Sequence, residues 1–344
     1  MSTTMNPLGM RGLAFAELSG NGDELGGLLQ KLGFHAERRH PSRDVTLYMQ
    51  GEAAFVVNGD KDCFAARFRE AHGPSVASLG FLVEDARRAF EEAVRRGARA
   101  YEGDAAKTFA TPAIYGVGDS LVYFVDGQGP YGSLVDRTLE VALGPSTVVD
   151  MGLLRIDHLT NNVEKGELPR WSKFYKEIFG FTEVRSFDIE GAKTGLYSFA
   201  LRSPCGTFCI PINEDKGQKG QIAEYLREYR GAGIQHIALT SRDLLGTLDR
   251  MGGAVPTLDI DETYYEHVFD RVPGVREDPK RIQAHDVLVD GDAEGYLLQI
   301  FTKNCIGPVF FELIQRENHA SFGEGNFGAL FRSIERDQER RGVI

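Results

Sequence analysis

Two histidines and one glutamate lie in apolar segments of the second half of this chain. They are His158, His236 and Glu312, and each stands in a short hydrophobic run typical of a β-strand. Two imidazoles and one carboxylate form the ligand set of mononuclear non-haem Fe(II) centres, which leave three coordination positions open. Fe(II) held in this way can bind an organic chelate and O2 together, so the three residues suggest a reaction class.

A simpler interpretation exists for each of these residues taken alone. Strand side chains alternate between faces, so Phe310 and Glu312 share one face of their strand. A carboxylate in such an apolar strand is costly to bury unless it is paired or bound to a metal. The partner could be Arg155 or Arg316, and a single buried histidine is usually a hydrogen-bonded core residue. The joint pattern favours a metal site, because a sheet curled around one pocket would bring the three residues together.

The two halves of the chain repeat one pattern. Each half has an apolar helical stripe that ends at a glycine, namely Leu25, Leu28, Leu29 and Leu32 before Gly33, and Trp171, Phe174, Tyr175, Ile178 and Phe179 before Gly180. A second helix in each half opens with an aspartate, Asp85 or Asp243. We therefore predict a unit of strand, helix and several strands, twice per half, with domains at 1–149 and 150–344.

The first half lacks the candidate metal ligands. Aligning the halves by these landmarks pairs Glu17 with His158, Ser78 with His236, and residues 120–125 with residues 310–312. The first half thus keeps the architecture without the ligands, and we interpret it as a structural or oligomerising half.

Composition excludes several classes of protein. The 344 residues are 26% charged and 42% hydrophobic, as in globular proteins, and no apolar stretch approaches the roughly 18 residues of a membrane span. The N-terminus lacks a secretory signal, and the four cysteines form no CxxC pair, which indicates reduced thiols in a cytoplasmic protein. A net charge of −11 argues against a nucleic-acid partner.

Eight motifs of the second half match a known family in order: DHLTNNV at 157–163, IPINE at 210–214, GIQHIA at 233–238, TYY at 263–265, LLQIFT at 297–302, GPVFFE at 307–312, FGEGNF at 322–327 and SIE at 333–335. The first half matches more loosely, through NPLG at 6–9 and HGPSV at 72–76. The chain resembles the 4-hydroxyphenylpyruvate dioxygenases of the vicinal-oxygen-chelate superfamily. This resemblance implies an α+β fold of tandem βαβββ modules that form two curled, mixed-sheet half-barrels with a C-terminal lid helix.

The resemblance also implies a cofactor and a reaction. One Fe(II) per chain would be held by His158, His236 and Glu312. The enzyme would use O2 to decarboxylate 4-hydroxyphenylpyruvate oxidatively, hydroxylate its ring and move its side chain, giving homogentisate and CO2 in tyrosine catabolism. The substrate's own α-keto acid can chelate the iron, so no separate keto acid is needed.

Eight substrate-pocket residues carry over from the family: Ser198, Asn213, Gln235, Gln299, Phe310, Phe322, Asn326 and Phe327. Ser198, Asn213 and Gln299 could form hydrogen bonds to the phenol end. Phe310 could wall the ring beside the metal. Gln235 poses a geometric problem, because neighbouring residues of a strand point in opposite directions and His236 must face the iron.

The C-terminal segment has the pattern of a lid. Gly323 and Gly325 would supply flexibility, and an apolar helical stripe follows that could cover the pocket and exclude water: Phe327, Leu330, Phe331 and Ile334. Related enzymes suggest a homo-oligomer, a tetramer or a dimer. Two alternatives remain open, a 4-hydroxymandelate synthase with the same substrate and metal, and a binding module without catalysis.

Overall fold

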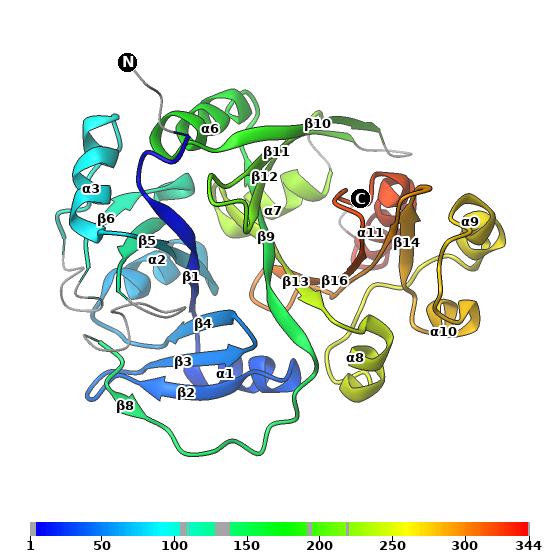
Figure 1. The fold of residues 1–344 in the computed structure, drawn as a ribbon, viewed down its shortest axis with the longest axis horizontal. Coiled ribbons are helices and arrows are strands. Elements are labelled where there is room, and N and C mark those ends of the chain that lie inside the picture. The colour runs from blue at the N-terminus through cyan, green and yellow to red at the C-terminus, as the bar shows by residue number, and fades with distance from the viewer. Residues whose placement is uncertain are drawn as a thin grey trace.

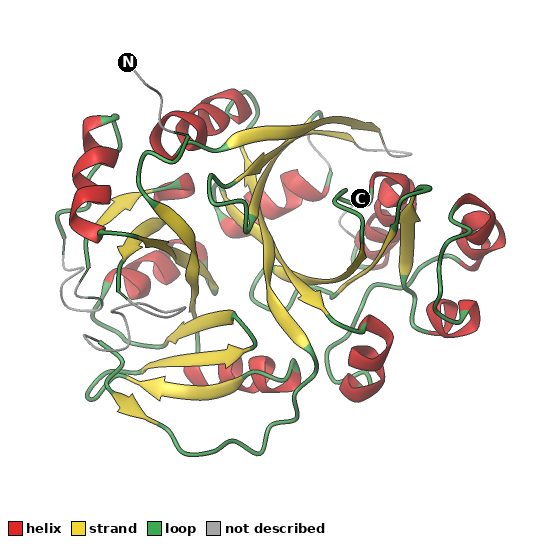
Figure 2. Ribbon diagram, viewed as in Figure 1, coloured by secondary structure: helices red, strands yellow, loops and turns green. Residues whose placement is uncertain are grey.

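Two curled eight-stranded sheets lie side by side and form the frame of the protein (Figures 1 and 2). The structure is a computed structural model, and it describes residues 5–103, 109, 111–127, 138–190, 195–217 and 220–342. Helices flank both sheets, and the second sheet curls around the C-terminal helix (Figure 1). The predicted α+β fold with two mixed half-barrel sheets is confirmed.

The first sheet has the strand order β6-β7-β5-β1-β4-β3-β2-β8. Its strands are β1 (Met10–Ser19), β2 (His35–Arg39), β3 (Val45–Gln50), β4 (Ala53–Asn58), β5 (Ser75–Val83), β6 (Ala113–Tyr115), β7 (Leu121–Val125) and β8 (Val141–Ala142). β1 runs antiparallel to β5 and parallel to β4, so the sheet is mixed.

The second sheet repeats this arrangement in the order β10-β11-β12-β9-β13-β16-β15-β14. Its strands are β9 (Leu153–Val163), β10 (Thr182–Glu190), β11 (Gly195–Arg202), β12 (Cys209–Asp215), β13 (Gly233–Ser241), β14 (Leu288–Gly291), β15 (Tyr296–Phe301) and β16 (Phe310–Glu317). The antiparallel pair β9–β13 stands at the centre. On one side β12 runs parallel to β9, and on the other β16 runs parallel to β13.

The helices connect and cover the strands. They are α1 (Gly22–Lys31), α2 (Phe64–His72), α3 (Ala86–Arg95), η1 (Val117–Asp119), α6 (Leu168–Phe174), its π-helical continuation η2 (Tyr175–Phe179), α7 (Gln221–Tyr229), α8 (Leu244–Met251), η3 (Glu262–Tyr264), α9 (Tyr265–Arg271), α10 (Pro279–Ala284), η4 (Glu324–Asn326) and α11 (Phe327–Arg340).

Local chemistry explains where several helices begin and end. Asp85 and Asp243 each cap a helix, since their carboxylates accept hydrogen bonds from backbone N–H groups in the first turn of α3 and α8. Gly180, which ends the α6–η2 helix, has φ of 82°, a left-handed conformation that glycine adopts without strain. The predicted helix boundaries at these residues are confirmed.

Strand pairing corrects the predicted alignment of the two halves. Glu17 lies opposite Ser78 between β1 and β5, and the residue opposite His236 between β9 and β13 is Thr160. Glu17 therefore corresponds to Thr160 and not to His158. The error is a shift of two residues, which leaves the same side chains on the same strand face, so the sequence pattern could not detect it.

Aromatic residues occupy two of the three ligand positions in the first sheet, and Ser78 stands at the third, that of His236. The strand registers place Phe15 where the second sheet has His158, and Tyr123 where it has Glu312. The rings of Phe15 and Tyr123 lie 6.3 Å apart in a buried cluster with Phe109. Side chains thus fill the part of the first half that corresponds to the metal site.

The two sheets share one hydrophobic core. Phe55 of β4 meets Phe311 of β16 edge to face with ring centroids 5.7 Å apart, and both rings are fully buried. The Gln50 amide oxygen also accepts hydrogen bonds from the backbone N–H groups of Met151 and Leu153, at the start of β9. Packing of the first half therefore supports the strands of the second.

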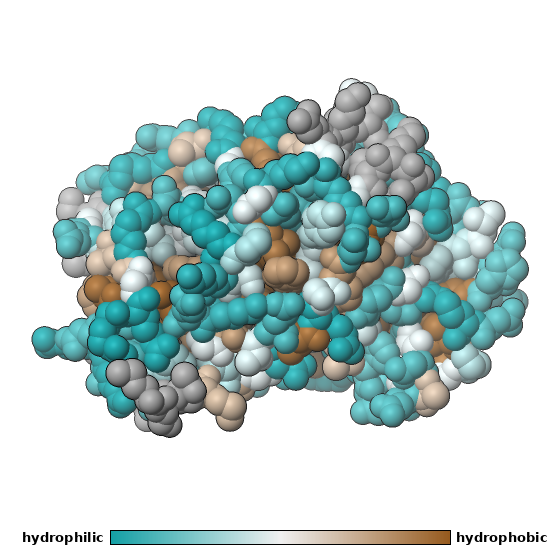
Figure 3. Space-filling view, turned by 90° about the horizontal axis from the view of Figure 1, so that it is seen from above, coloured by the Kyte–Doolittle hydropathy of each residue, from teal (hydrophilic) through white to brown (hydrophobic). Residues whose placement is uncertain are grey.

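On the face drawn in Figure 3, hydrophilic residues dominate and the hydrophobic ones form small separate patches. Among the described residues, no helix is long and apolar enough to cross a membrane.

Candidate metal centre

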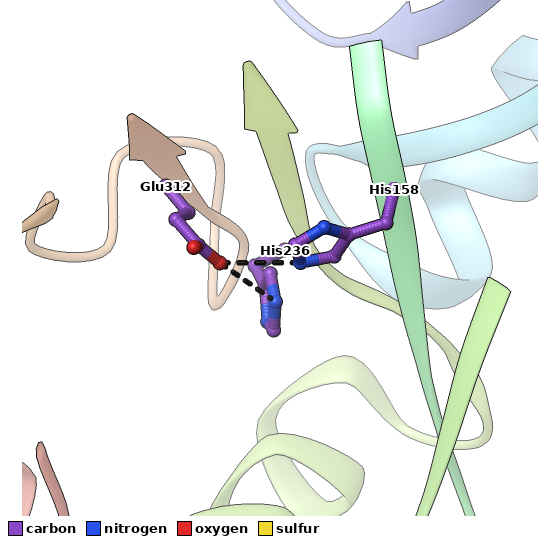
Figure 4. A group of neighbouring side chains, drawn as sticks. All are labelled: His158, His236 and Glu312. Atoms are coloured by element: carbon purple, nitrogen blue, oxygen red, sulfur yellow. Dashed lines mark ion pairs between the residues drawn. The ribbon is translucent and has the colours of Figure 1, made fainter. Parts of the chain in front are cut away.

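Three neighbouring strands bring the two histidines and the glutamate together. His158 of β9, His236 of β13 and Glu312 of β16 point toward one another (Figure 4), with one potential ligand atom from each within 4.8 Å of the others. Glu312 Oε2 lies 3.2 Å from His158 Nε2 and 3.6 Å from His236 Nε2. The glutamate and His158 are 3% exposed. Two imidazole nitrogens and a carboxylate oxygen that converge in a buried site fit a divalent transition metal.

The simpler interpretation of Glu312 as the partner of an arginine is wrong. Arg316 instead makes a two-pronged ion pair with Asp157, with Nε–Oδ1 and Nη2–Oδ2 distances of 3.0 and 2.9 Å. Asp157 Oδ2 also lies 2.8 Å from His158 Nδ1. A carboxylate at the outer nitrogen of a histidine orients the ring and directs the other nitrogen toward a metal. The structure thus supplies the support that a ligand histidine requires.

The electrostatics of the two histidines differ. Burial lowers the pKa of His158, but the carboxylates of Glu312 and Asp157 outweigh burial and raise this pKa to about 9. Burial lowers the pKa of His236 well below its ordinary value, and the charge on His158 lowers it further. His236 is therefore neutral at pH 7, and the neutral imidazole is the form that binds metals. A metal ion that binds His158 must first displace a proton from its imidazole.

Two contacts orient the ring of His236. The Thr160 hydroxyl lies 2.9 Å from Nε2, and the Phe310 ring stacks on the imidazole with centroids 5.0 Å apart. The other nitrogen, Nδ1, is buried and has no hydrogen-bond partner among the described residues. Nε2 is thus the nitrogen that faces Glu312.

A mainly apolar cavity opens beside the cluster. Its lining includes all three candidate ligands and seven of the eight predicted pocket residues, namely Ser198, Asn213, Gln235, Gln299, Phe310, Phe322 and Phe327. The eighth, Asn326, is absent from the described lining and lies behind Gln299, to whose Oε1 it donates a hydrogen bond of 3.0 Å. Ser198 and Asn213 stand directly opposite each other on β11 and β12.

A strand irregularity lets both Gln235 and His236 reach the cavity. The pairing of β13 with β9 shifts register between Ile234 and His236, so Gln235 sits at a bulge. Gln235 lines the cavity and its Nε2 lies 3.4 Å from Gln221 Oε1. The bulge removes the conflict that strict alternation of side chains would create.

The C-terminal helix α11 closes the cavity. The four residues of the predicted apolar stripe all line it: Phe327, Leu330, Phe331 and Ile334. Toward its C-terminal end, α11 is held by the Arg340–Asp259 pair, with both N–O distances 3.0 Å, and by Gln338, which donates to Glu224 at 2.7 Å. The helix thus has the position of a lid over the cluster.

Sequence reasoning missed three residues around this site. Asp157 supports His158, Thr160 contacts His236, and Phe187 of β10 packs on Phe327 with ring centroids 5.3 Å apart. Asp157 carried a usable signal, because a carboxylate next to a candidate ligand histidine is a common supporting partner. Thr160 could have been found by its spacing of two residues from His158, which places both on one strand face.

Comparison with known proteins places the chain in a superfamily. Residues 155–284 match the family model described as glyoxalase, bleomycin resistance protein and dioxygenase superfamily. Residues 4–140 match the model for the N-terminal part of hydroxyphenylpyruvate dioxygenase. A solved mutant of 4-hydroxymandelate synthase from Streptomyces coelicolor superposes with a TM-score of 0.81 and 28% identity, covering 96% of this chain and 99% of that one. The curled sheets and the buried cluster thus define a vicinal-oxygen-chelate protein.

Relatives that match along the whole chain identify the family within this superfamily. The 4-hydroxyphenylpyruvate dioxygenase of Legionella pneumophila is 45% identical over 98% of both chains, and that of Pseudomonas aeruginosa is 42% identical over 98% of this chain and 97% of its own. Protein MelA of Shewanella colwelliana is 50% identical over the whole of both chains. The chain belongs to the 4-hydroxyphenylpyruvate dioxygenase family, as the sequence motifs predicted, and is therefore an oxidoreductase of the dioxygenase type.

Proposed function

We propose that this protein binds one Fe(II) per chain through His158, His236 and Glu312. With this ion it converts 4-hydroxyphenylpyruvate and O2 into homogentisate and CO2, as part of tyrosine catabolism. One oxygen atom of O2 enters the ring as the new hydroxyl group, and the other enters the carboxylate that remains after loss of CO2. The single observation that carries the proposal is the convergence of these three side chains beside an apolar, lid-covered cavity, in a chain of this family.

Different residues of the cavity have different proposed roles. Bound Fe(II) supplies electrons and open coordination positions for O2 and the keto acid. Ser198 and Asn213, which face each other on β11 and β12, would form hydrogen bonds to the phenol end, together with Gln235, which lines the same cavity. Phe310, stacked on the His236 ring, walls the substrate beside the metal.

Further aromatic residues close the site. Phe322 contacts the His158 ring with centroids 5.6 Å apart, and Phe327 begins the lid helix. Excluding water from this cavity strengthens the interactions inside it and protects the reaction from side products. Gln299 and Asn326 are also predicted to bind substrate. The Gln299 amide donates to Glu312 and accepts from the Asn326 amide.

Oxygen uptake by metal-free protein, reconstituted with Fe(II) and 4-hydroxyphenylpyruvate, tests the proposal. Homogentisate and CO2 in equal amounts, identified by chromatography and gas analysis, are the expected products. His236→Ala should abolish uptake. His285→Ala is the matched control, since His285 pairs with Asp249 outside the cavity and should be replaceable without loss.

Two other outcomes would assign a different function. Release of 4-hydroxymandelate would identify a synthase that hydroxylates the benzylic carbon, an alternative supported by the structural similarity to 4-hydroxymandelate synthase. Binding of 4-hydroxyphenylpyruvate without oxygen uptake, in the presence of bound Fe(II), would identify a binding module.

We also propose that residues 1–149 are a structural or oligomerising half and that residues 150–344 are the catalytic half. The aromatic filling of the first half, where the second has its ligands, supports this division. Four free cysteines are in keeping with the cytoplasm, and the resemblance supports a homo-oligomer. Light scattering of the purified protein would measure its oligomeric state.

A further inference from the structure

A chain of hydrogen bonds runs from Glu312 out of the cavity. Gln299 Nε2 donates to Glu312 Oε1 at 3.2 Å, and Asn326 Nδ2 donates to Gln299 Oε1 at 3.0 Å. Asn326 Oδ1 in turn accepts from Arg271 Nη2 at 3.2 Å and lies 2.7 Å from the Tyr264 hydroxyl. This hydroxyl accepts from the Val289 N–H and directs its one proton to Asn326 Oδ1 or to the Val289 oxygen, 2.8 Å away. Gln299 and Asn326 are 2% and 1% exposed, so water does not compete for these groups.

The two ends of this chain fix its direction. A carboxylate such as that of Glu312 only accepts hydrogen bonds, whereas the guanidinium of Arg271 only donates them. The amides of Gln299 and Asn326 lie between these two ends, so each can adopt only one orientation. In both amides the nitrogen points toward the Glu312 end and the oxygen toward the Arg271 end. Turning either amide would bring oxygen against oxygen or leave a buried polar group unpaired, which is costly.

The same residues hold the backbone that leads into α11. Asn326 directly precedes the helix, and the N–H of Gly325 donates to Asp290 Oδ2 at 3.0 Å. Arg271 binds the other oxygen of this carboxylate at 2.8 Å. At Gly323, whose φ is +76°, a Cβ would lie 1.8 Å from Gln299 Oε1. Gly323 thus permits close packing on Gln299, and Gly325 permits close packing on Arg271. The sequence had predicted only that these glycines supply flexibility.

We propose that Tyr264 and Arg271 are positioning residues that couple closure of the lid helix α11 to the metal-binding geometry of Glu312. Neither lines the described cavity, so they act through Asn326 and Gln299. If α11 moves away, Asn326 leaves Gln299, whose amide is then free to turn away from Glu312. Coupling between two sites is reciprocal, so a metal bound at Glu312 stabilises the closed lid. This inference rests on the proposed function of Glu312 as a ligand.

Co(II) binding to the metal-free, full-length protein tests the coupling without substrate. Its absorption spectrum reports the dissociation constant and the coordination, and hydrogen exchange measured by mass spectrometry reports protection of residues 327–340. Tyr264→Phe removes the hydroxyl that lies against Asn326 and that also bonds the backbone of Val289. Tyr265→Phe is the matched control, because the neighbouring hydroxyl donates to the backbone oxygen of Val287 at 3.2 Å and has no bond to Asn326.

The expected result separates the two tyrosines. Tyr264→Phe should bind Co(II) about 3- to 10-fold more weakly, less than the roughly 10- to 100-fold loss for a residue that touches a ligand, since Arg271 retains one bond to Asn326. Co(II) should also protect α11 less in this variant. Tyr265→Phe should match the wild type within about twofold in both measurements.

Asn326→Asp provides a second variant of unchanged size that reverses the chain. An aspartate cannot donate to Gln299, so the amide of Gln299 must turn and present its oxygen to Glu312. Weaker Co(II) binding in Asn326→Asp than in Tyr264→Phe would support the coupling. This variant also gives the answer if Tyr264→Phe loses its fold by circular dichroism.

Two results would overturn the proposal, and they are distinguishable. If Tyr264→Phe and Asn326→Asp match Tyr265→Phe in both affinity and protection, the lid and the metal site are not coupled. If the wild type binds no Co(II), the proposed ligand set itself fails, and the coupling fails with it. Turnover of 4-hydroxyphenylpyruvate does not enter the measurement, so a wrong substrate would leave this test intact.

Discussion

Replacing Glu312 by glutamine tests the proposed ligand set most directly. Glu312 is buried, with Oε2 3.2 Å from His158 Nε2 and 3.6 Å from His236 Nε2. Glutamine has the same shape, so packing is preserved while the negative charge is lost. His158, whose pKa this carboxylate raises, can release its proton in the variant, so no unpaired charge stays buried. The fold should therefore survive while metal binding weakens.

The size of the effect can be worked out. Residues that support a ligand cost roughly 10- to 100-fold in metal affinity when replaced, so loss of the carboxylate ligand should cost at least about 100-fold. Fe(II) at about 100 times the wild-type Kd stabilises the folded protein by about 2.7 kcal/mol. At the same concentration, a Kd weaker by about 100-fold leaves about 0.4 kcal/mol. At roughly 2 °C per kcal/mol, the rise in Tm should fall from about 5 °C to about 1 °C.

Anaerobic thermal unfolding with and without Fe(II) measures this difference. Glu317→Gln is the matched control, because Glu317 lies on the same strand but pairs with Arg276 at the surface. It should show the full wild-type rise in Tm. An Fe(II)-dependent rise in Glu312→Gln equal to that of the control would remove Glu312 from the ligand set and refute the reasoning.

Three further predictions concern the pocket, the core and the first half. Phe310→Ile removes the ring stacked on His236. Turnover should fall roughly tenfold, and part of the product should become 4-hydroxymandelate. Unchanged product ratios by chromatography would contradict this prediction. Phe55→Ala removes the fully buried ring that packs on Phe311. The free energy of unfolding measured in urea titrations should fall by about 3–5 kcal/mol. A loss below about 1 kcal/mol would argue against the shared core. Burial raises the pKa of Glu17, despite its hydrogen bond from Ser78, so the wild type loses stability as pH rises above the ordinary carboxyl pKa of about 4. Glu17→Gln cannot ionise and should gain in Tm relative to the wild type between pH 5 and pH 8; a Tm difference independent of pH would contradict the buried charge.

Local sequence was sufficient for elements whose pattern lies within one turn or one strand. Asp85 and Asp243 were recognisable as helix caps because the capping bond is made within three residues. The stripe from Phe327 to Ile334 was recognisable as a helix with one apolar face because helical spacing is regular. The family motifs extended this reading to the curled sheets, which strand patterns alone do not specify.

Contacts between distant segments were beyond the sequence. The alignment of Glu17 with His158 was wrong by two residues, because register depends on pairing with another strand and not on the strand's own pattern. The bulge at Gln235 also arises from pairing, and it alone brings Gln235 and His236 to one cavity.

The sequence by itself determined the chemistry available at the site: two imidazoles and a carboxylate in apolar strands, in a duplicated chain with the motifs of one dioxygenase family. Only the tertiary structure decided how that chemistry is supported. Arg316 binds Asp157, 159 residues away, and among the described residues Glu312 is paired with the two histidines and with no arginine. The amide direction of Gln299 likewise depends on groups from three other segments. Hydrogen-bond direction and ion pairing are properties of groups that meet in space, and their partners cannot be assigned before the strands are placed.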